Sequence, residues 1–184
     1  RAGDRVGLLV FGQRAYTLTP LTLDLTTVRQ QLDDSVVGLA GRETAIGDAL
    51  ALATKRLQSQ PSDQRVVILL TDGVNTAGVL DPDKAAELAH DAHVRVHTIA
   101  FGGEGGMSVF GFHLPMPGGE DPIDEAGLQR IAQATGGRFF RARDTESLAG
   151  IYGEIDRLEP IRRPGQAVRP RLESPTPRPR RCVS

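Results

Sequence analysis

A run of apolar residues ends in polar side chains that could bind a metal ion. Residues 66–70 are all apolar, and Thr71-Asp72-Gly73-Val74-Asn75 follows them directly. A carboxylate at the tip of a buried strand is a natural ligand for a hard cation, and glycine lets backbone or ligand come close. The alternative is that Asp72 only caps the turn by a hydrogen bond to the backbone. The local pattern is compatible with both roles.

A hydroxyl group and a second carboxylate occur earlier in the chain. The loop Gly41-Arg42-Glu43-Thr44 opens a segment with helical spacing of its apolar residues, and Asp48 lies one turn after Thr44 on the same face. Taken alone, Thr44 would be the N-terminal cap of this helix. Taken together with Asp72, its hydroxyl is a second oxygen that could bind the same cation.

Apolar periodicity predicts the elements that must position these residues. The run 66–71 shows no alternation, as expected for a strand that is buried on both faces. Strands alternate with helices, which indicates an α/β fold: a doubly wound, mostly parallel sheet with helices on both faces. Ligands of such sheets bind beyond the carboxyl ends of central strands, where Asp72 lies. We expect strands over 5–11, 15–18, 66–71, 94–100 and 138–142, a short hairpin near 109–114, and helices over 44–58 and after Asp24, Asp81, Asp124 and Asp144.

The order and spacing of these segments resemble the von Willebrand factor A (VWA) domain family. The resemblance extends over residues 5–158 and is carried by the Gly-x-x-Thr loop at 41–44, the Thr-Asp-Gly turn at 71–73, and the segments 4–12 and 134–140. Within the family, the chain is most similar to the bacterial aerotolerance-type (Bat-like), membrane-tethered branch. The resemblance implies a VWA or Rossmann-like fold and a protein-interaction module that is not an enzyme.

The same resemblance implies a metal-ion-dependent adhesion site (MIDAS). Thr44 and Asp72 would be the metal ligands, the ion would be Mg²⁺, Mn²⁺ or Ca²⁺, and a carboxylate from a protein partner would complete the shell. Residues that would support them are Gly41, Asp48, Gly73 and Asn75.

One segment of the family pattern is absent. No Asp-x-Ser-x-Ser occurs in the chain, and the chain starts where the family's second strand starts. The resemblance therefore implies that the first central strand, which would lie between the strands at 6–11 and 66–71, is missing, together with the first helix and most metal ligands. We expect metal binding by this chain to be weak or absent.

The resemblance also suggests partners and a location. It points to a MoxR-type AAA+ ATPase and other VWA proteins as partners, and to a membrane-tethered bacterial protein whose soluble domain is periplasmic. No run approaches the roughly 18 apolar residues of a membrane span, and the first residues are too polar for a secretory signal. We therefore expect this chain by itself to be soluble, with no targeting signal.

Composition and charge divide the chain into two parts. Of its 184 residues, 39% are hydrophobic and 24% charged, which is typical of one globular domain. The net charge is −1, but residues 160–184 hold seven Arg, one Glu and half of the 12 prolines. We expect a VWA-like domain over 1–159 and a disordered tail over 160–184. Nucleic acid is not an expected partner, because no basic stripe with interleaved aromatic residues occurs in the domain.

Two other functions remain as alternatives. A metal-independent structural or assembly module would keep the fold and bind partners through helix faces. A metal-dependent hydrolase is the third interpretation. A phosphatase that used Asp72 as nucleophile would need an acid where Val74 stands, and the glycines around Ser108 do not match a serine hydrolase. A zinc pair of His93 and His97 would place one histidine in a strand, where four residues span about 13 Å.

Overall fold

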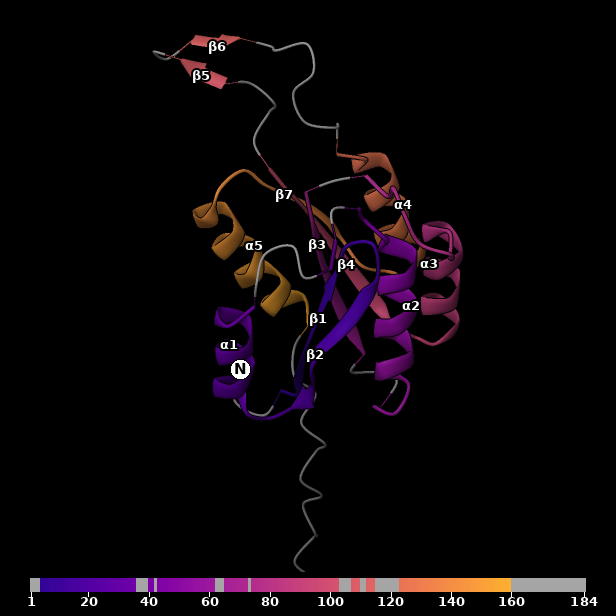
Figure 1. The fold of residues 1–184 in the computed structure, drawn as a ribbon. Coiled ribbons are helices and arrows are strands. Elements are labelled where there is room, and N and C mark those ends of the chain that lie inside the picture. The colour runs from indigo at the N-terminus through magenta and orange to yellow at the C-terminus, as the bar shows by residue number, and fades with distance from the viewer. Residues whose placement is uncertain are drawn as a thin grey trace, which may run out of the picture.

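The computed structural model describes residues 4–35, 40–41, 43–61, 65–72, 74–102, 107–109, 112–114 and 123–159. Gly73 and the tail over 160–184 lie outside these residues, so the expectations for them stay predictions. Strands and helices alternate along the domain (Figure 1). In chain order they are β1 (Val6–Phe11), β2 (Ala15–Thr22), α1 (Leu25–Asp33), α2 (Ile46–Leu57), β3 (Val66–Thr71), α3 (Pro82–Asp91), β4 (Arg95–Phe101), β5 (Met107–Val109), β6 (Phe112–Leu114), α4 (Glu125–Ala134), β7 (Phe139–Ala142) and α5 (Thr145–Leu158).

Three parallel strands form the main sheet. Their order is β3-β4-β7, with Val66 opposite Arg95 and Thr71 opposite Ala100. The strands β1 and β2 form a separate antiparallel pair, and β5 and β6 form another. The prediction of an α/β fold with a parallel sheet is confirmed.

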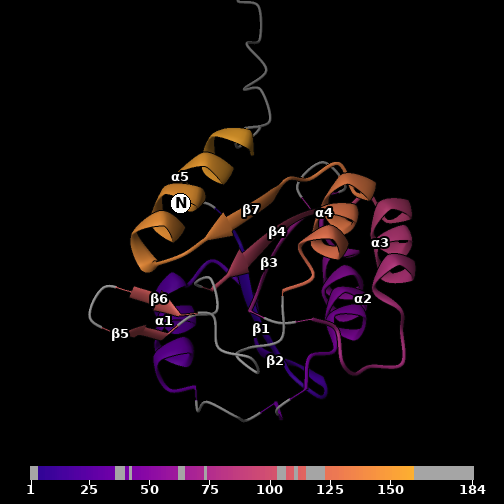
Figure 2. The same ribbon diagram turned by 90° about the horizontal axis from the view of Figure 1, so that it is seen from above.

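Helices cover both faces of the strands (Figures 1 and 2). The helices α2, α3 and α4 lie on one side, and α1 and α5 lie on the other. The larger core lies under α2, α3 and α4 and includes Leu50, Leu69, Val96 and Ile131. A smaller core under α5 contains Ile99, Ala142 and Ile155. The main sheet is therefore held mainly from the α2 side.

Aspartates begin four of the five helices, as predicted. Each carboxylate accepts hydrogen bonds from backbone N–H groups of the first turn, which have no partner within the helix. At the start of α5, hydrogen bonds from the backbone and the hydroxyl of Ser147 lower the pKa of the Asp144 carboxyl below its usual value. The exception is α2, whose N-cap residue is Ala45 and has no side-chain oxygen to offer.

β3 has a different environment from the one that its sequence predicts. Leu69 is 4% exposed, but Ile68 and Leu70, on the opposite face, are 40% and 38% exposed. Among the described strands, β3 pairs only with β4 and β1 pairs only with β2, so no ladder joins the two sheets. The prediction of burial on both faces is wrong, because the described elements leave the face that carries Ile68 and Leu70 partly open to solvent.

We expect these open edges to cause self-association of the 184-residue chain. Unpaired strand edges pair readily with other chains, and each unsatisfied buried backbone group costs about 1–3 kcal/mol. Thermal unfolding at two protein concentrations, with size-exclusion chromatography, should show a transition that shifts with concentration. A monomer with one cooperative, concentration-independent transition would contradict this prediction.

We also expect Gly47→Ala to destabilise the domain. A Cβ atom on Gly47, in α2, would lie 1.9 Å from the carbonyl oxygen of Leu80, so the backbones touch here. The added methyl group should lower the free energy of unfolding by about 1–3 kcal/mol. Gly150→Ala in α5 is the matched control, because a Cβ there meets no atom within 4 Å and alanine favours the helix by up to about 1 kcal/mol. Equal changes in urea denaturation of the two variants would refute the assigned contact.

Candidate functional site

The predicted metal ligands lie on two segments at the carboxyl end of β3. Asp72 follows the last residue of β3, and Thr44 lies two residues before the start of α2. The segment 74–80, which leads from β3 to α3, is hydrogen-bonded to residues 44–48. The fold therefore brings together the two motifs that the sequence singles out.

The main chain of Thr44 is fixed by the segment after β3. Its N–H donates to Oγ1 of Thr76 at 2.9 Å. Its carbonyl oxygen accepts from the N–H groups of Thr76 at 2.9 Å and Ala77 at 3.2 Å. The N-cap residue of α2 is Ala45, so the alternative role of Thr44 as the helix cap is wrong. The Thr44 hydroxyl does not accept a hydrogen bond from the first turn of α2.

Asn75 supplies the cap that α2 lacks. Its Oδ1 accepts a hydrogen bond of 2.8 Å from the N–H of Ile46, the first residue of the helix. The two residues are 29 positions apart, so no local sequence pattern could identify this cap. The role of Asn75 in the described structure is to position the helix start.

Asp48 anchors the same segment from the first turn of α2. Its carboxylate accepts from the N–H of Val79 at 3.1 Å and of Leu80 at 2.9 Å. Gly78 lies beside it with a φ of +103°, and a Cβ there would be 3.2 Å from the carboxyl carbon of Asp48. Gly78, between Ala77 and Val79, was not among the predicted site residues, and its left-handed φ is a conformation that glycine adopts without steric cost. Gly41, which was predicted, has a φ of +92° and lies against Gln13.

Two oxygen-bearing side chains remain available at this edge. Asp72 is exposed, and no described group forms a hydrogen bond or ion pair with its carboxylate. The hydroxyl of Thr44 likewise forms no hydrogen bond with a described residue. Capping of the turn by Asp72 therefore gains no support from the described residues.

The donors at this edge fit only part of a metal site. Carboxylate and hydroxyl oxygens suit a hard cation, but Mg²⁺ takes about six oxygens in near-octahedral geometry. Among the described residues, no group of three or more His, Cys, Asp or Glu side chains could hold a metal ion. The other ligands would have to be waters, partner groups or residues that the structure does not describe.

The family model of the von Willebrand factor type A domain matches residues 1–154. The chain belongs to this family.

An aerotolerance-related membrane protein from Bacteroides fragilis is 26% identical, with a TM-score of 0.68 and 85% of this chain and 81% of that chain covered. Proximal thread matrix protein 1 from the mussel byssus, with a zinc-occupied MIDAS motif, is 25% identical, with a TM-score of 0.61 and coverages of 84% and 34%. An uncharacterized membrane-spanning protein from Vibrio fischeri is 50% identical, with coverages of 87% and 78% and a TM-score of 0.48.

Curated relatives of this VWA domain are longer than the chain. An uncharacterized protein from Borreliella burgdorferi is 25% identical over 170 residues, which are 89% of this chain and 49% of that protein. A UPF0353 protein from Nocardia farcinica is 28% identical over 177 residues, with coverages of 84% and 50%. The chain spans about half the length of the curated relatives it matches.

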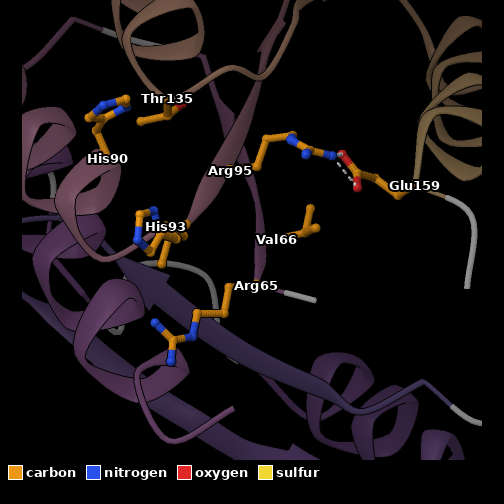
Figure 3. A pocket seen from close by; sticks show the side chains of 8 residues that line it. Arg65, Val66, His90, His93, Arg95, Thr135 and Glu159 are labelled. Carbon is orange, nitrogen blue, oxygen red and sulfur yellow. Dashed lines mark hydrogen bonds and ion pairs between the residues drawn. The ribbon is translucent and has the colours of Figure 1, made fainter. Parts of the chain in front are cut away.

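A polar pocket of about 240 Å³ lies at the opposite end of the strands (Figure 3). The guanidinium of Arg65 donates to the carbonyl oxygens of Gln58, Gln60 and Ala92 at 2.7–2.8 Å. These carbonyl groups follow the C-terminal ends of α2 and α3, so Arg65 links the two helix ends. Arg95 points away from the two histidines of the pocket, toward Glu159. The pocket therefore offers few free donors for a ligand. Its lining residues are Arg65, Val66, His90, His93, Val94, Arg95, Thr135 and Glu159.

We expect two substitutions of Asn75 to test whether its side-chain oxygen stabilises the start of α2. Asn75→Ala removes the acceptor for the Ile46 N–H and should lower the free energy of unfolding by about 1 kcal/mol. Asn75→Asp keeps an acceptor oxygen and adds a negative charge at a helix N-terminus, so it should retain the stability. Urea denaturation of both variants, with hydrogen exchange at the Ile46 amide, measures the difference. Equal losses for alanine and aspartate would exclude the capping role.

Proposed function

We propose that this VWA domain is a non-enzymatic protein-interaction module that binds a partner through a divalent cation, Mg²⁺ or a similar ion. Thr44 and Asp72 would hold the ion, and a carboxylate of the partner would complete its shell. The observation that carries this proposal is that the Asp72 carboxylate and the Thr44 hydroxyl form no hydrogen bond with a described residue and lie on two segments that are hydrogen-bonded to each other. The ion would supply the positive charge that the partner's carboxylate recognises.

The hydrogen bonds around the site support binding by pre-organisation. Residues 44–48 and 75–80 are joined through the main chain of Thr44 and the side chains of Asn75, Thr76 and Asp48. Because these hydrogen bonds fix the two segments relative to each other, little conformational entropy would be lost when the site is filled. We assign Asp48 and Asn75 to positioning, and Gly41 and Gly73 to the turns on either side.

The remaining metal ligands would come from a segment like the family's Asp-x-Ser-x-Ser. A strand paired in parallel with the open edge of β3 would end beside Asp72, because the carboxyl ends of parallel strands meet at one edge. The length of the curated relatives leaves room for such a segment. The zinc-occupied MIDAS of the mussel protein supports divalent-metal binding within the family.

We further propose a membrane-associated bacterial context. The aerotolerance-related membrane protein from Bacteroides fragilis supports a tethered, Bat-like protein, for which we propose a periplasmic domain, a MoxR-type AAA+ ATPase and other VWA proteins as partners. No helix in the described part of the chain is long and apolar enough to cross a bilayer.

A metal-independent interaction module is the second candidate. It is favoured because, among the described residues, no group of three or more His, Cys, Asp or Glu side chains could hold a metal ion. Such a module would keep the fold and the interlocked segments but would bind its partner without an ion. No observation favours a hydrolase.

We expect Asp72→Asn and Thr44→Val to weaken both metal and partner binding in the full-length protein. Mn²⁺ titration monitored by calorimetry should show at least about tenfold weaker binding for each variant, because one of few protein ligands is lost. Binding of the MoxR-type ATPase should fall with each variant and also when chelator is added to the wild type. Asp33→Asn, at the exposed end of α1, is the matched control and should change neither. Partner binding that is insensitive to chelator and to Asp72→Asn would leave only the metal-independent module.

A further inference from the structure

The loop that carries Thr44 is held from two directions. On one side, the carbonyl oxygen of Thr44 accepts hydrogen bonds from the segment after β3. On the other side, the loop 40–45, described except for residue 42, contacts the turn that follows β1. This second contact comes from the strand pair β1–β2, which carries none of the candidate ligands.

Two backbone hydrogen bonds join the loop 40–45 to the turn after β1. The N–H of Gln13 donates to the carbonyl oxygen of Ala40 at 2.6 Å, at the first residue of the loop. The N–H of Ala45 donates to the carbonyl oxygen of Gly12 at 2.8 Å, at the last residue of the loop. Both ends of the loop are therefore fixed relative to the end of β1.

Glycine is required on both sides of this contact. A Cβ atom on Gly12 would lie 2.4 Å from the carbonyl oxygen of Ala40 and 2.9 Å from that of Gly41. Gly41 has a φ of +92°, which glycine adopts without steric cost, and a Cβ there would lie 2.9 Å from the Cβ of Gln13. The loop thus packs directly on the backbone of the turn, and an added methyl group would push the two apart.

A shift at the turn would reach Thr44 through one residue. Ala45, whose N–H is bound by Gly12, directly follows Thr44 and is 0% exposed, so its neighbours limit its movement. The carbonyl oxygen of Thr44 in turn accepts from the N–H groups of Thr76 at 2.9 Å and Ala77 at 3.2 Å. The end of β1, the Thr44 loop and the segment after β3 therefore form one continuous hydrogen-bonded path.

The same path connects the pair β1–β2 to the candidate site. Among the described strands, no ladder joins β1 to β3. The side chains of Phe11 and Leu21 pack on the main core, whereas the backbone bonds of Gln13 and Ala45 are directed at the loop itself. A displacement of β1–β2 relative to the main sheet would therefore change the position of the loop.

We propose that the turn after β1 positions Thr44, and that a ligand bound at the Thr44 hydroxyl is coupled through the loop 40–45 to the pair β1–β2. Gly12 and Gly41 are positioning residues, because they touch the backbone of the turn and the loop and bind no ligand themselves. Coupling of this kind is reciprocal: a ligand that fixes Thr44 tightens the contact with Gly12, and loss of that contact weakens ligand binding. The part that concerns a ligand rests on the proposed function.

Hydrogen exchange of the full-length protein without metal tests the positioning role. In Gly12→Ala, the amides of Thr76 and Ala77 should exchange about tenfold faster than in the wild type, because their acceptor on Thr44 is displaced. Exchange at Ile99, within β4, should stay unchanged and so exclude unfolding of the main sheet as the cause. Unchanged exchange of Thr76 and Ala77 in Gly12→Ala would overturn the proposal.

Gly7→Ala is the matched control from the same strand. A Cβ on Gly7 would lie 3.2 Å or more from its nearest neighbours, which are atoms of Thr19 and Leu21 on β2. It adds the same methyl group to β1 but does not meet the loop. Exchange of the segment after β3 should therefore remain as in the wild type, and acceleration equal to that in Gly12→Ala would overturn the role of Gly12.

A titration with Mn²⁺ tests the coupling and needs no variant of β1. Saturating Mn²⁺ should slow exchange of the Gln13 and Ala45 amides about fivefold in the wild type, and should not do so in Thr44→Val. By calorimetry, the affinity for Mn²⁺ should fall about fivefold in Gly12→Ala and stay unchanged in Gly7→Ala. The exchange of the wild type provides the test if Gly12→Ala does not fold.

The outcomes separate this inference from the proposed function. Binding of Mn²⁺ without any change at Gln13 and Ala45 would overturn the coupling and leave the proposed function intact. A wild type that binds no Mn²⁺ would refute both the proposed metal site and the coupling to its ligand. The metal-free exchange of the segment after β3 would then still decide whether Gly12 positions Thr44.

Discussion

The structure of the candidate site depends on hydrogen bonds between two segments that are far apart in sequence. Asn75 caps α2 from the segment after β3, and Asp48 holds that segment from within α2. Because α2 has no cap of its own, its start and the path from β3 to α3 stabilise each other. The positions of Thr44 and Asp72 follow from this reciprocal arrangement rather than from any contact between the two side chains.

Among the described strands, β3 pairs on one edge only, and the candidate site lies at its carboxyl end. Ile68 and Leu70 are partly exposed on one face of β3, and few oxygen-bearing side chains of the described residues lie near Asp72. One further strand paired with the free edge of β3 would supply both a cover for these apolar residues and additional ligands. Among the described elements, the fold is held by the ladders β3-β4-β7 and by the helices packed on them.

Local patterns predicted most elements correctly because local chemistry determines them. The caps Asp24, Asp81, Asp124 and Asp144 each act within one turn of their helix, so their positions can be read from adjacent residues. The cap of α2 and the contacts of Gly12 come from remote segments, and no periodicity reveals them. The error at β3 has another cause: an apolar run without alternation does not show which of its faces the neighbouring elements cover, and the face with Ile68 and Leu70 is partly exposed among the described residues.

The helix α2 contacts β1 and β2 as well as β3, whereas no strand ladder joins those two sheets. The pair β1–β2 with α1 is therefore attached to the rest of the domain chiefly through side-chain packing on one helix and through the loop contacts near Gly12 and Ala45. An opening of the pair β1–β2 would therefore break no hydrogen bond of the ladders β3-β4-β7, whereas it would expose part of α2 and the side chains of Phe11 and Leu21 that pack on the main core.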